Sequence, residues 1–288
     1  MTPEQIHILI ILIVLLHIIA GIIVLAILIG TLNSKYRQFV IEHSESLKQL
    51  DVINANYRFN AVKMYDYCHS YDNEHFYDTI STRDYLIYQL ANARKRVIDS
   101  IRAAQENKEL LKKYKEDISE KCKLGIFDTD ELLPDTKKLL RFEEKIFKKR
   151  TKQPITAFSI DVYLELTNIN GVHRGGKSGR YYSPDILRLI ERIENKSGDF
   201  YNDQDIWDAI CRVERGRVSN KLRFAIYERD GHRCRKCGRR TDDLEIDHIV
   251  PIAKGGKSTP DNLQTLCHRC NKAKGTKTED YTPRKRRW

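Results

Sequence analysis

The chain has 288 residues and a formal net charge of +11. Three of its seven cysteines, Cys68, Cys122 and Cys211, stand alone, so the composition argues against a disulfide-stabilised secreted protein and for a reducing compartment. Residues 212–288 hold 21 Lys and Arg against 10 Asp and Glu, whereas residues 1–211 hold 30 of each sign, so the positive excess lies near the carboxyl end, where it favours a polyanionic partner.

Residues 6–29 contain no Asp, Glu, Lys or Arg and are almost entirely aliphatic. As a helix they would be about 36 Å long, which is enough to cross the hydrocarbon core of a bilayer. A cleaved signal peptide is the alternative, but it would need a basic amino-terminal region and a small-residue cleavage site. We therefore expect a retained single-pass anchor over residues 1–33. Lys35 and Arg37 follow it, so the positive-inside tendency places the rest of the chain in the cytoplasm, at the inner (plasma) membrane.

Residues 34–152 are predicted to be mostly helical. Apolar residues recur at steps of three and four from Leu86 to Ala104, and this helix is expected to begin near residue 81 and to continue toward Ile118. A break is expected at residues 124–128, and Pro134 begins another helical stretch through Phe147. Such a region can serve as a stalk, as a homo-oligomerisation element or as a binding surface for a phage or host protein.

Residues 153–200 are predicted to form a small α/β unit. Strict alternation from Phe158 to Leu166 indicates a half-buried strand, Asn170-Gly171 indicates a hairpin, and Ser183-Pro184 begins a helix. Residues 171–178 match the phosphate-loop pattern by letter. We reject that interpretation because no helix can start at Lys177-Ser178, and we expect a flexible, basic, glycine-rich loop there instead. Residues 201–222 are predicted to be a linker or helix.

Two Cys-x-x-Cys pairs occur near the carboxyl end: Cys234 with Cys237, and Cys267 with Cys270. Four thiolates at this spacing can close a tetrahedral, structural zinc site. Two disulfides, or four unrelated buried cysteines, are the alternatives. Two tight pairs with identical spacing favour Zn²⁺.

Asp247 and His248 lie between the two cysteine pairs, on a run of β-branched and apolar residues that predicts a short strand. On a regular strand their side chains point to opposite sides, so a local bend would be needed for both to face one phosphate. Asn262 follows in a predicted loop. Asn271 comes directly after Cys270, at the expected start of a short helix.

These motifs resemble the HNH endonuclease family, with its ββα-metal fold, over residues 223–274, and the cysteine pairs resemble its zinc-supported subgroup. The resemblance implies that His248 is the general base and that Asn262 orients the surrounding loop and the His248 ring. It implies that Asp247 and Asn271 hold a catalytic Mg²⁺ or Mn²⁺ ion. Asparagine in place of the family's final histidine favours these hard cations over a transition metal.

The resemblance also implies nucleic acid as the partner, DNA rather than RNA, with contacts from Arg269, Lys272 and Lys274. The nuclease domain is expected over residues 223–278, followed by a basic tail over residues 279–288. The alternative is a membrane-tethered DNA-binding zinc module or adaptor without catalysis. A membrane-anchored nuclease would meet foreign DNA at its entry, which suggests a role in bacterial anti-phage defence. The predicted fold is α+β: a transmembrane helix, a helical middle region, the small α/β unit and the zinc-bearing ββα domain.

Overall fold

The computed structural model describes residues 3–129, 135–197 and 200–281. The chain forms two compact units, one of Met1–Asn60 with Glu106–Thr156, the other of Ala61–Gln105 with Ala157–Trp288. These units differ from the predicted segments, because part of the region that was expected to be helical belongs with the α/β unit and the carboxyl-terminal domain.

The first unit begins with helix α1 (Pro3–His43). Within the described chain, one helical segment, Val14–His43, is both long enough and apolar enough to span a membrane. The mean hydropathy of its most apolar window is 2.8. Its aliphatic side chains from Val14 to Ile29 are exposed on all sides. A helix that is hydrophobic all round needs lipid or protein around it, so α1 could span a membrane.

Beyond α1, the first unit is held together by a small core and a buried carboxylate. Helices α2 (Glu45–Asn56) and α5 (Thr136–Arg150) pack with the end of α1, and Ser44 caps α2 by accepting a hydrogen bond from the Leu47 N–H. Glu143 is fully buried and accepts hydrogen bonds from the hydroxyls of Ser44 and Ser46 and from the Gly125 N–H. The predicted helix start at Pro134 lies outside the described residues.

Helix α4 (Thr82–Lys121) has 40 residues and contributes to both units. Its start and its continuation past Ile118 agree with the prediction from apolar spacing. A non-helical residue, Ala93, interrupts it at φ −138° and ψ 19°. The chain turns after Lys121, so the predicted break at residues 124–128 is confirmed.

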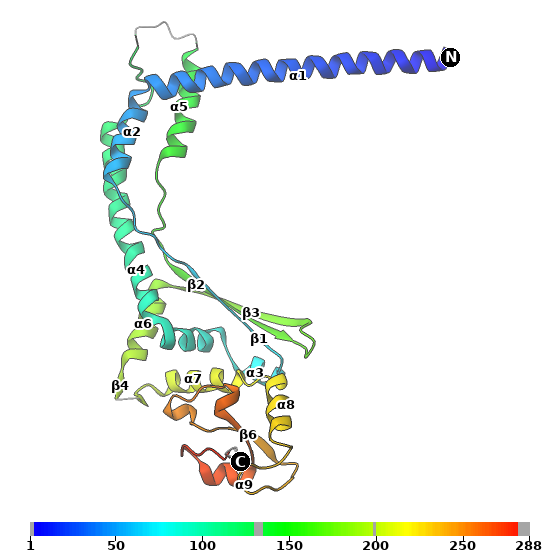
Figure 1. Cartoon of the computed structure of the whole chain (residues 1–288). Coiled ribbons are helices and arrows are strands. Elements are labelled where there is room, and N and C mark those ends of the chain that lie inside the picture. The colour runs from blue at the N-terminus through cyan, green and yellow to red at the C-terminus, as the bar shows by residue number, and fades with distance from the viewer. Residues whose placement is uncertain (1–2, 130–134, 198–199, 282–288) are drawn as a thin grey trace, which may run out of the picture. The chain divides into compact units, whose positions relative to one another are not determined.

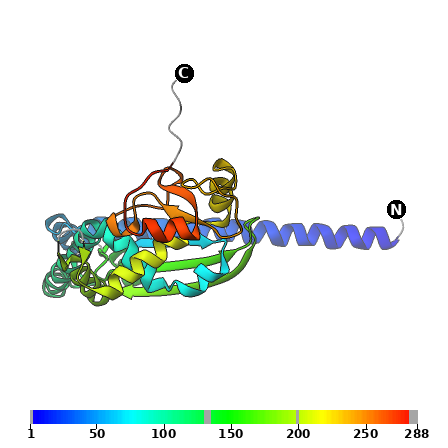
Figure 2. The ribbon, with the colours of Figure 1, turned by 90° about the horizontal axis from the view of Figure 1, so that it is seen from below.

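The second unit contains a three-stranded sheet with the order β1-β2-β3: Tyr65–Tyr71, Ser159–Thr167 and His173–Tyr182. β1 pairs with β2 in parallel and β2 pairs with β3 antiparallel, and Figure 2 shows the strands from below. β1 was missed by the sequence analysis and lies inside the region predicted to be helical. Its inward positions, Tyr65, Tyr67, His69 and Tyr71, alternate with exposed ones, which was the available signal.

The phosphate-loop-like residues form most of β3 rather than a flexible loop, so the expectation of a loop was wrong. Lys177 donates hydrogen bonds to the carbonyls of Tyr77, Asp78 and Ile80. These carbonyls lie at the end of the short helix α3 (Glu74–Thr79). The lysine therefore caps a helix end, and β3 pairs with β2 along its length because the hairpin turn at Asn168–Val172 sets its register.

Helices α6 (Ser183–Glu194) and α7 (Gln204–Gly216) supply the apolar faces that cover this sheet. Pro184 lies in the first turn of α6, as predicted, and Asp203 caps α7 by accepting from the N–H groups of Asp205 and Ile206. The core joins Ile160, Val162 and Leu164 of β2 with the buried sides of α4, α6 and α7. Two two-residue strands, β4 (Lys196–Ser197) and β5 (Phe200–Tyr201), link α6 to α7.

The carboxyl-terminal part of the second unit begins with α8 (Asn220–Arg229), which Ser219 caps. It continues with the antiparallel hairpin of β6 (Leu244–His248) and β7 (Leu263–Cys267), then α9 (His268–Lys274). Two short 3₁₀ helices, Ile252–Lys254 and Pro260–Asn262, lie in the connection between the strands. This strand–strand–helix order is visible in Figure 1 and agrees with the predicted ββα fold. The basic tail from residue 282 onward lies outside the described residues.

Candidate active site and metal centre

The four paired cysteines converge. The sulfur atoms of Cys234, Cys237, Cys267 and Cys270 all lie within 4.8 Å of one another, and the sulfurs of Cys237 and Cys267 are 3.9 Å apart. A tetrahedral zinc with bonds of about 2.3 Å places its sulfur ligands about 3.8 Å from each other. The four thiols therefore fit a zinc ion, and the pairing into two disulfides is not what the structure has.

The protonation of these thiols is uneven. Burial raises the pKa of Cys234, but N–H groups of Cys237, Cys267 and Lys236 bring it down to about 7. Burial and the neighbouring thiols raise the pKa of Cys270 to about 12. A bound cation would be needed to keep all four as thiolates, which is the usual state of zinc ligands.

The hairpin beside this cluster is held by a buried carboxylate. Asp230, at the end of α8, accepts hydrogen bonds from the Thr265 N–H of β7 and from the guanidinium groups of Arg229 and Arg235. Burial opposes ionisation of Asp230, but these donors outweigh it and lower its pKa below the ordinary value. The apolar cluster around the thiols contains few residues besides the cysteines themselves, so stability here depends on the cysteine site and this ion pair.

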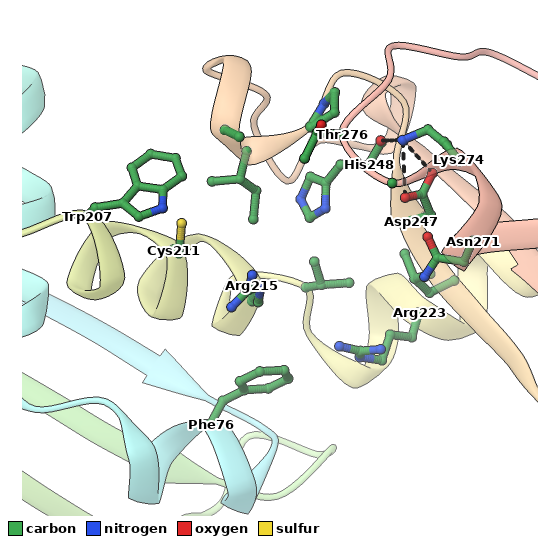
Figure 3. Close-up of a pocket in the computed structure, with 16 residues that line it drawn as sticks. Phe76, Trp207, Cys211, Arg215, Arg223, Asp247, His248, Asn271, Lys274 and Thr276 are labelled. Carbon is green, nitrogen blue, oxygen red and sulfur yellow. Dashed lines mark hydrogen bonds and ion pairs between the residues drawn. The ribbon is translucent and has the colours of Figure 1, made fainter. Parts of the chain in front are cut away.

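Asp247, His248 and Asn271 line one cavity of about 490 Å³. Asp247 and His248 are the last two residues of β6, and Asn271 lies within α9 rather than at its start. Figure 3 shows the three side chains entering the cavity from these two elements. Adjacent strand residues point to opposite sides, yet both Asp247 and His248, at the end of β6, border this cavity.

His248 makes a hydrogen bond that fixes which ring nitrogen can act as a base. Its Nε2 lies 2.9 Å from the hydroxyl oxygen of Ser258. That hydroxyl donates its own hydrogen to the backbone oxygen of Glu214, at 2.5 Å. Ser258 can then only accept from His248, so Nε2 carries the ring hydrogen and Nδ1 is left as an acceptor.

Glu214 holds the loop that carries Ser258. It lies on α7, is only 1% exposed, and one carboxylate oxygen accepts from the Ser258 N–H at 2.6 Å. The loop turns tightly before Ser258, since a Cβ on Gly256 would overlap the backbone oxygen of Val250. The position of the histidine partner therefore depends on α7 and on a glycine.

Burial lowers the pKa of His248 below its ordinary value. The cations Arg215 and Lys274 add to this effect, and the carboxylates Glu214 and Asp247 oppose it. The ring is consequently neutral near pH 7, the state in which it can accept a proton.

Lys274 departs from its predicted role as a nucleic-acid contact. It is 1% exposed, its ammonium lies 3.2 Å from an Asp247 carboxylate oxygen, and it donates to the His248 backbone oxygen at 2.8 Å. Figure 3 draws these interactions as dashed lines. The lysine is buried because it follows Asn271 by three residues on α9 and faces back onto β6. Arg269 and Lys272, the other two predicted contacts, are exposed on α9.

Asp247 and Asn271 retain oxygen lone pairs for a divalent cation. The Asp247 carboxylate accepts from Lys274 and, at 2.9 Å, from Gln264 Nε2, which leaves part of its acceptor capacity free. The Asn271 Nδ2 donates to Glu245 at 2.5 Å, and so its Oδ1 is the free acceptor. Carboxylate and amide oxygens are suitable ligands for Mg²⁺ or Mn²⁺, so this pair fits such an ion.

Asn262 organises the loop, and its side-chain hydrogen bonds within the described chain go to backbone groups rather than to the His248 ring. Its amide accepts from the Val250 N–H at 2.8 Å and donates to the backbone oxygens of Val250 and Lys257. Within the described chain, the ring contact expected of Asn262 is made by Ser258 instead. The expectation for the loop agrees with these contacts, and the expectation for the ring does not.

A known protein family matches this part of the chain. Residues 233–277 match the HNH endonuclease family model. The chain carries an HNH endonuclease domain. The matched segment includes all four cysteines and the predicted catalytic residues, while Glu214 and Arg215 lie before it on α7.

The HNH domain is also similar to part of the CRISPR-associated endonuclease Cas9 of Corynebacterium diphtheriae, at 41% identity over 56 residues. That stretch is 18% of this chain and 5% of Cas9. No solved structure matches the chain. The match is thus of about HNH-domain length, and the chain spans only a small part of that relative.

Sequence reasoning missed Ser258, Glu214, Glu245 and Gln264 as partners of the HNH residues. Glu245 had a signal, since it lies two residues before Asp247 and so on the same face of the strand. Ser258 and Glu214 had none, because they meet His248 only through the packing of α7 against the loop.

Removing zinc should unfold the hairpin and α9, because few apolar residues are buried there. We expect about one zinc ion per chain in the purified protein and its loss on Cys267→Ser, with a drop in unfolding free energy above about 3 kcal/mol. Elemental analysis and thermal unfolding measure both. Cys122→Ser, which changes a thiol in the other unit, should alter neither. Zinc retained at wild-type occupancy in Cys267→Ser would reject the site.

Ser258→Ala should release the His248 tautomer, because the ring then loses its acceptor at Nε2. Nitrogen-15 spectra of histidine-labelled protein at pH 8 should show the Nε2–H form of His248 in the wild type and a mixture of tautomers in the variant. Ser258→Thr keeps the hydroxyl and should resemble the wild type. Identical His248 signals in Ser258→Ala and wild type would refute the assignment.

Proposed function

We propose that this chain is a membrane-anchored, metal-dependent endonuclease that hydrolyses phosphodiester bonds of DNA, with His248 as the general base. The observation that carries the proposal is the His248 ring. Its Nε2 is engaged by Ser258, its Nδ1 is free to accept, and it borders the same cavity as the oxygen ligands Asp247 and Asn271. Phosphodiester hydrolysis needs such a base beside a site for positive charge.

In the proposed reaction, His248 Nδ1 removes the proton from the attacking water while the Ser258 hydroxyl keeps the ring in place. Lys274 and Gln264 fix the Asp247 carboxylate, and Glu245 fixes the Asn271 amide. A divalent ion on these two side chains would neutralise the charge that develops on the phosphate and the leaving oxygen. The ammonium of Lys274, which pairs with Asp247 at the cavity wall, contributes further positive charge.

DNA is proposed as the substrate on the family resemblance. Nucleic acid in general is supported by the positive excess of residues 212–288 and by the endonuclease name of the Cas9 relative. Arg269 and Lys272 are exposed on α9, where they can contact the phosphate backbone.

His248→Ala should lower plasmid nicking by about 10²–10⁴-fold in Mg²⁺ or Mn²⁺, because the general base is lost. Asn271→Ala should lower it as well and raise the metal concentration needed for half-maximal rate. His173→Ala, an exposed histidine on β3, is the matched control and should cleave like the wild type. Parallel assays on single- and double-stranded DNA and RNA identify the substrate.

If wild type and His248→Ala are equally inactive on every nucleic acid while both bind DNA, the chain is a DNA-binding zinc module without catalysis. Such a binder would not require a neutral histidine and two oxygen ligands around one cavity.

The anchor is proposed from α1, whose aliphatic side chains from Val14 to Ile29 are exposed on all sides. We place the HNH domain in the cytoplasm from the basic residues Lys35 and Arg37 and from the need to keep the thiols reduced. A nuclease held at the membrane would meet incoming phage DNA early, and this is the basis for the proposed defensive role. The helical first unit is the proposed site for self-association or for a phage or host protein.

Deleting residues 1–33 should move the protein from the membrane to the soluble fraction and leave in vitro nicking within about twofold, because the deleted residues lie outside the catalytic unit. Protection of cells against phage should fall by about tenfold or more in plaque counts. Replacing the segment with an unrelated transmembrane helix should restore it. Unchanged protection by the soluble form would reject localisation as part of the function.

A further inference from the structure

Two arginines outside the family match border the catalytic cavity. Arg215 lies on α7 and Arg223 lies on α8, and both line the cavity that Asp247 and His248 line. Figure 3 shows them entering from these helices, while the catalytic side chains enter from β6 and α9. The cavity wall thus includes cationic groups that the HNH segment does not supply.

Neither arginine is neutralised. Among the described residues, no carboxylate oxygen lies within 4.0 Å of either guanidinium, whereas Arg212 and Arg229, close by on the same two helices, pair with Asp84 and Asp230 at 2.9 Å and 2.8 Å. The Nε of Arg223 is buried and has no hydrogen-bond partner. A buried donor without an acceptor is costly. The Nε of Arg212 is in the same state, so what distinguishes Arg223 is that it lines the cavity with no carboxylate partner among the described residues.

The Arg223 side chain and the α7 backbone next to Arg215 are fixed by neighbouring residues. The Arg223 guanidinium lies 5.5 Å from the centre of the Phe76 ring. Arg215 is followed by Gly216. A Cβ at Gly216 would overlap the side chains of Ile80 and Tyr71, so the α7 backbone packs directly against these two residues. The preceding residue, Glu214, holds Ser258. Neighbouring residues of α7 therefore provide Arg215 at the cavity and Glu214, which holds the hydrogen-bond partner of His248.

We propose that Arg215 and Arg223 form a phosphate-binding site that grips the nucleic-acid backbone beside the bond to be cut. The inference rests on the proposed function and extends it to a substrate subsite on α7 and α8. A guanidinium offers several N–H donors in a planar fork that matches phosphate oxygens. These two cations, which line the cavity, attract the polyanion into it.

The test measures binding without cleavage. Full-length His248→Ala protein in detergent is titrated with a fluorescent DNA duplex at salt concentrations from about 50 to about 200 mM. The logarithm of the binding constant is plotted against the logarithm of the salt concentration, and the slope is measured. A second substitution in this parent, Arg215→Ala or Arg223→Ala, should weaken DNA binding several-fold. Each should reduce the salt slope by about 0.9, because each phosphate contact releases about that many counterions from duplex DNA. Arg215→Lys and Arg223→Lys should retain the slope of the parent.

Arg188→Ala is the matched control, since Arg188 is exposed on α6 and pairs with Asp185 away from the cavity. Its affinity and slope should equal those of the parent. If the parent binds DNA and both cavity variants match Arg188→Ala, the arginine site is wrong and the nuclease function is untouched. If the parent does not bind the DNA duplex, the proposed function on DNA fails and the arginine site fails with it. A variant that loses affinity but keeps the full slope also contradicts phosphate contact.

Discussion

The convergence of four thiols on one point is the constraint on which the carboxyl-terminal domain depends. Cys234 and Cys237 lie before β6, while Cys267 ends β7 and Cys270 lies on α9. A cation shared by these sulfurs would tie the loop after α8 to the end of the hairpin and to the helix. Because the surrounding apolar cluster is small, this link would substitute for a hydrophobic core. It would fix the distance between β6, which carries Asp247 and His248, and α9, which carries Asn271.

The catalytic geometry is not confined to the family match. Helix α7 supplies Glu214, which holds Ser258 against the His248 ring, and Arg215, which borders the same cavity. The position of α7 is in turn set by its buried face, where Ile206, Ala209 and Val213 pack into the core of the α/β sheet. The small α/β unit and the HNH domain are thereby mechanically joined, so a change at α7 would reach His248 through the single loop that carries Ser258.

Several features were predictable because their signals are local. The cysteine spacing, the short strand at residues 244–248, the helix after Ser183-Pro184 and the long aliphatic segment all follow from a few neighbouring residues. β1 was missed, since it contains no Val, Ile or Leu and lies among helical patterns. β3 was assigned to a loop because glycine and basic residues outweigh its alternation, and its strand structure comes from pairing with β2.

The sequence by itself determined the chemistry: thiols spaced for zinc, a histidine and oxygen ligands spaced for an HNH site, and an apolar segment long enough for a membrane. Only the tertiary structure decided how each side chain is used. It buried Lys274 on Asp247, replaced Asn262 by Ser258 as the partner of His248, and brought Arg215 and Arg223 to the cavity. The physical reason is that residue type fixes what a group can donate or accept, whereas burial and partners depend on segments far apart in the chain that meet only on folding.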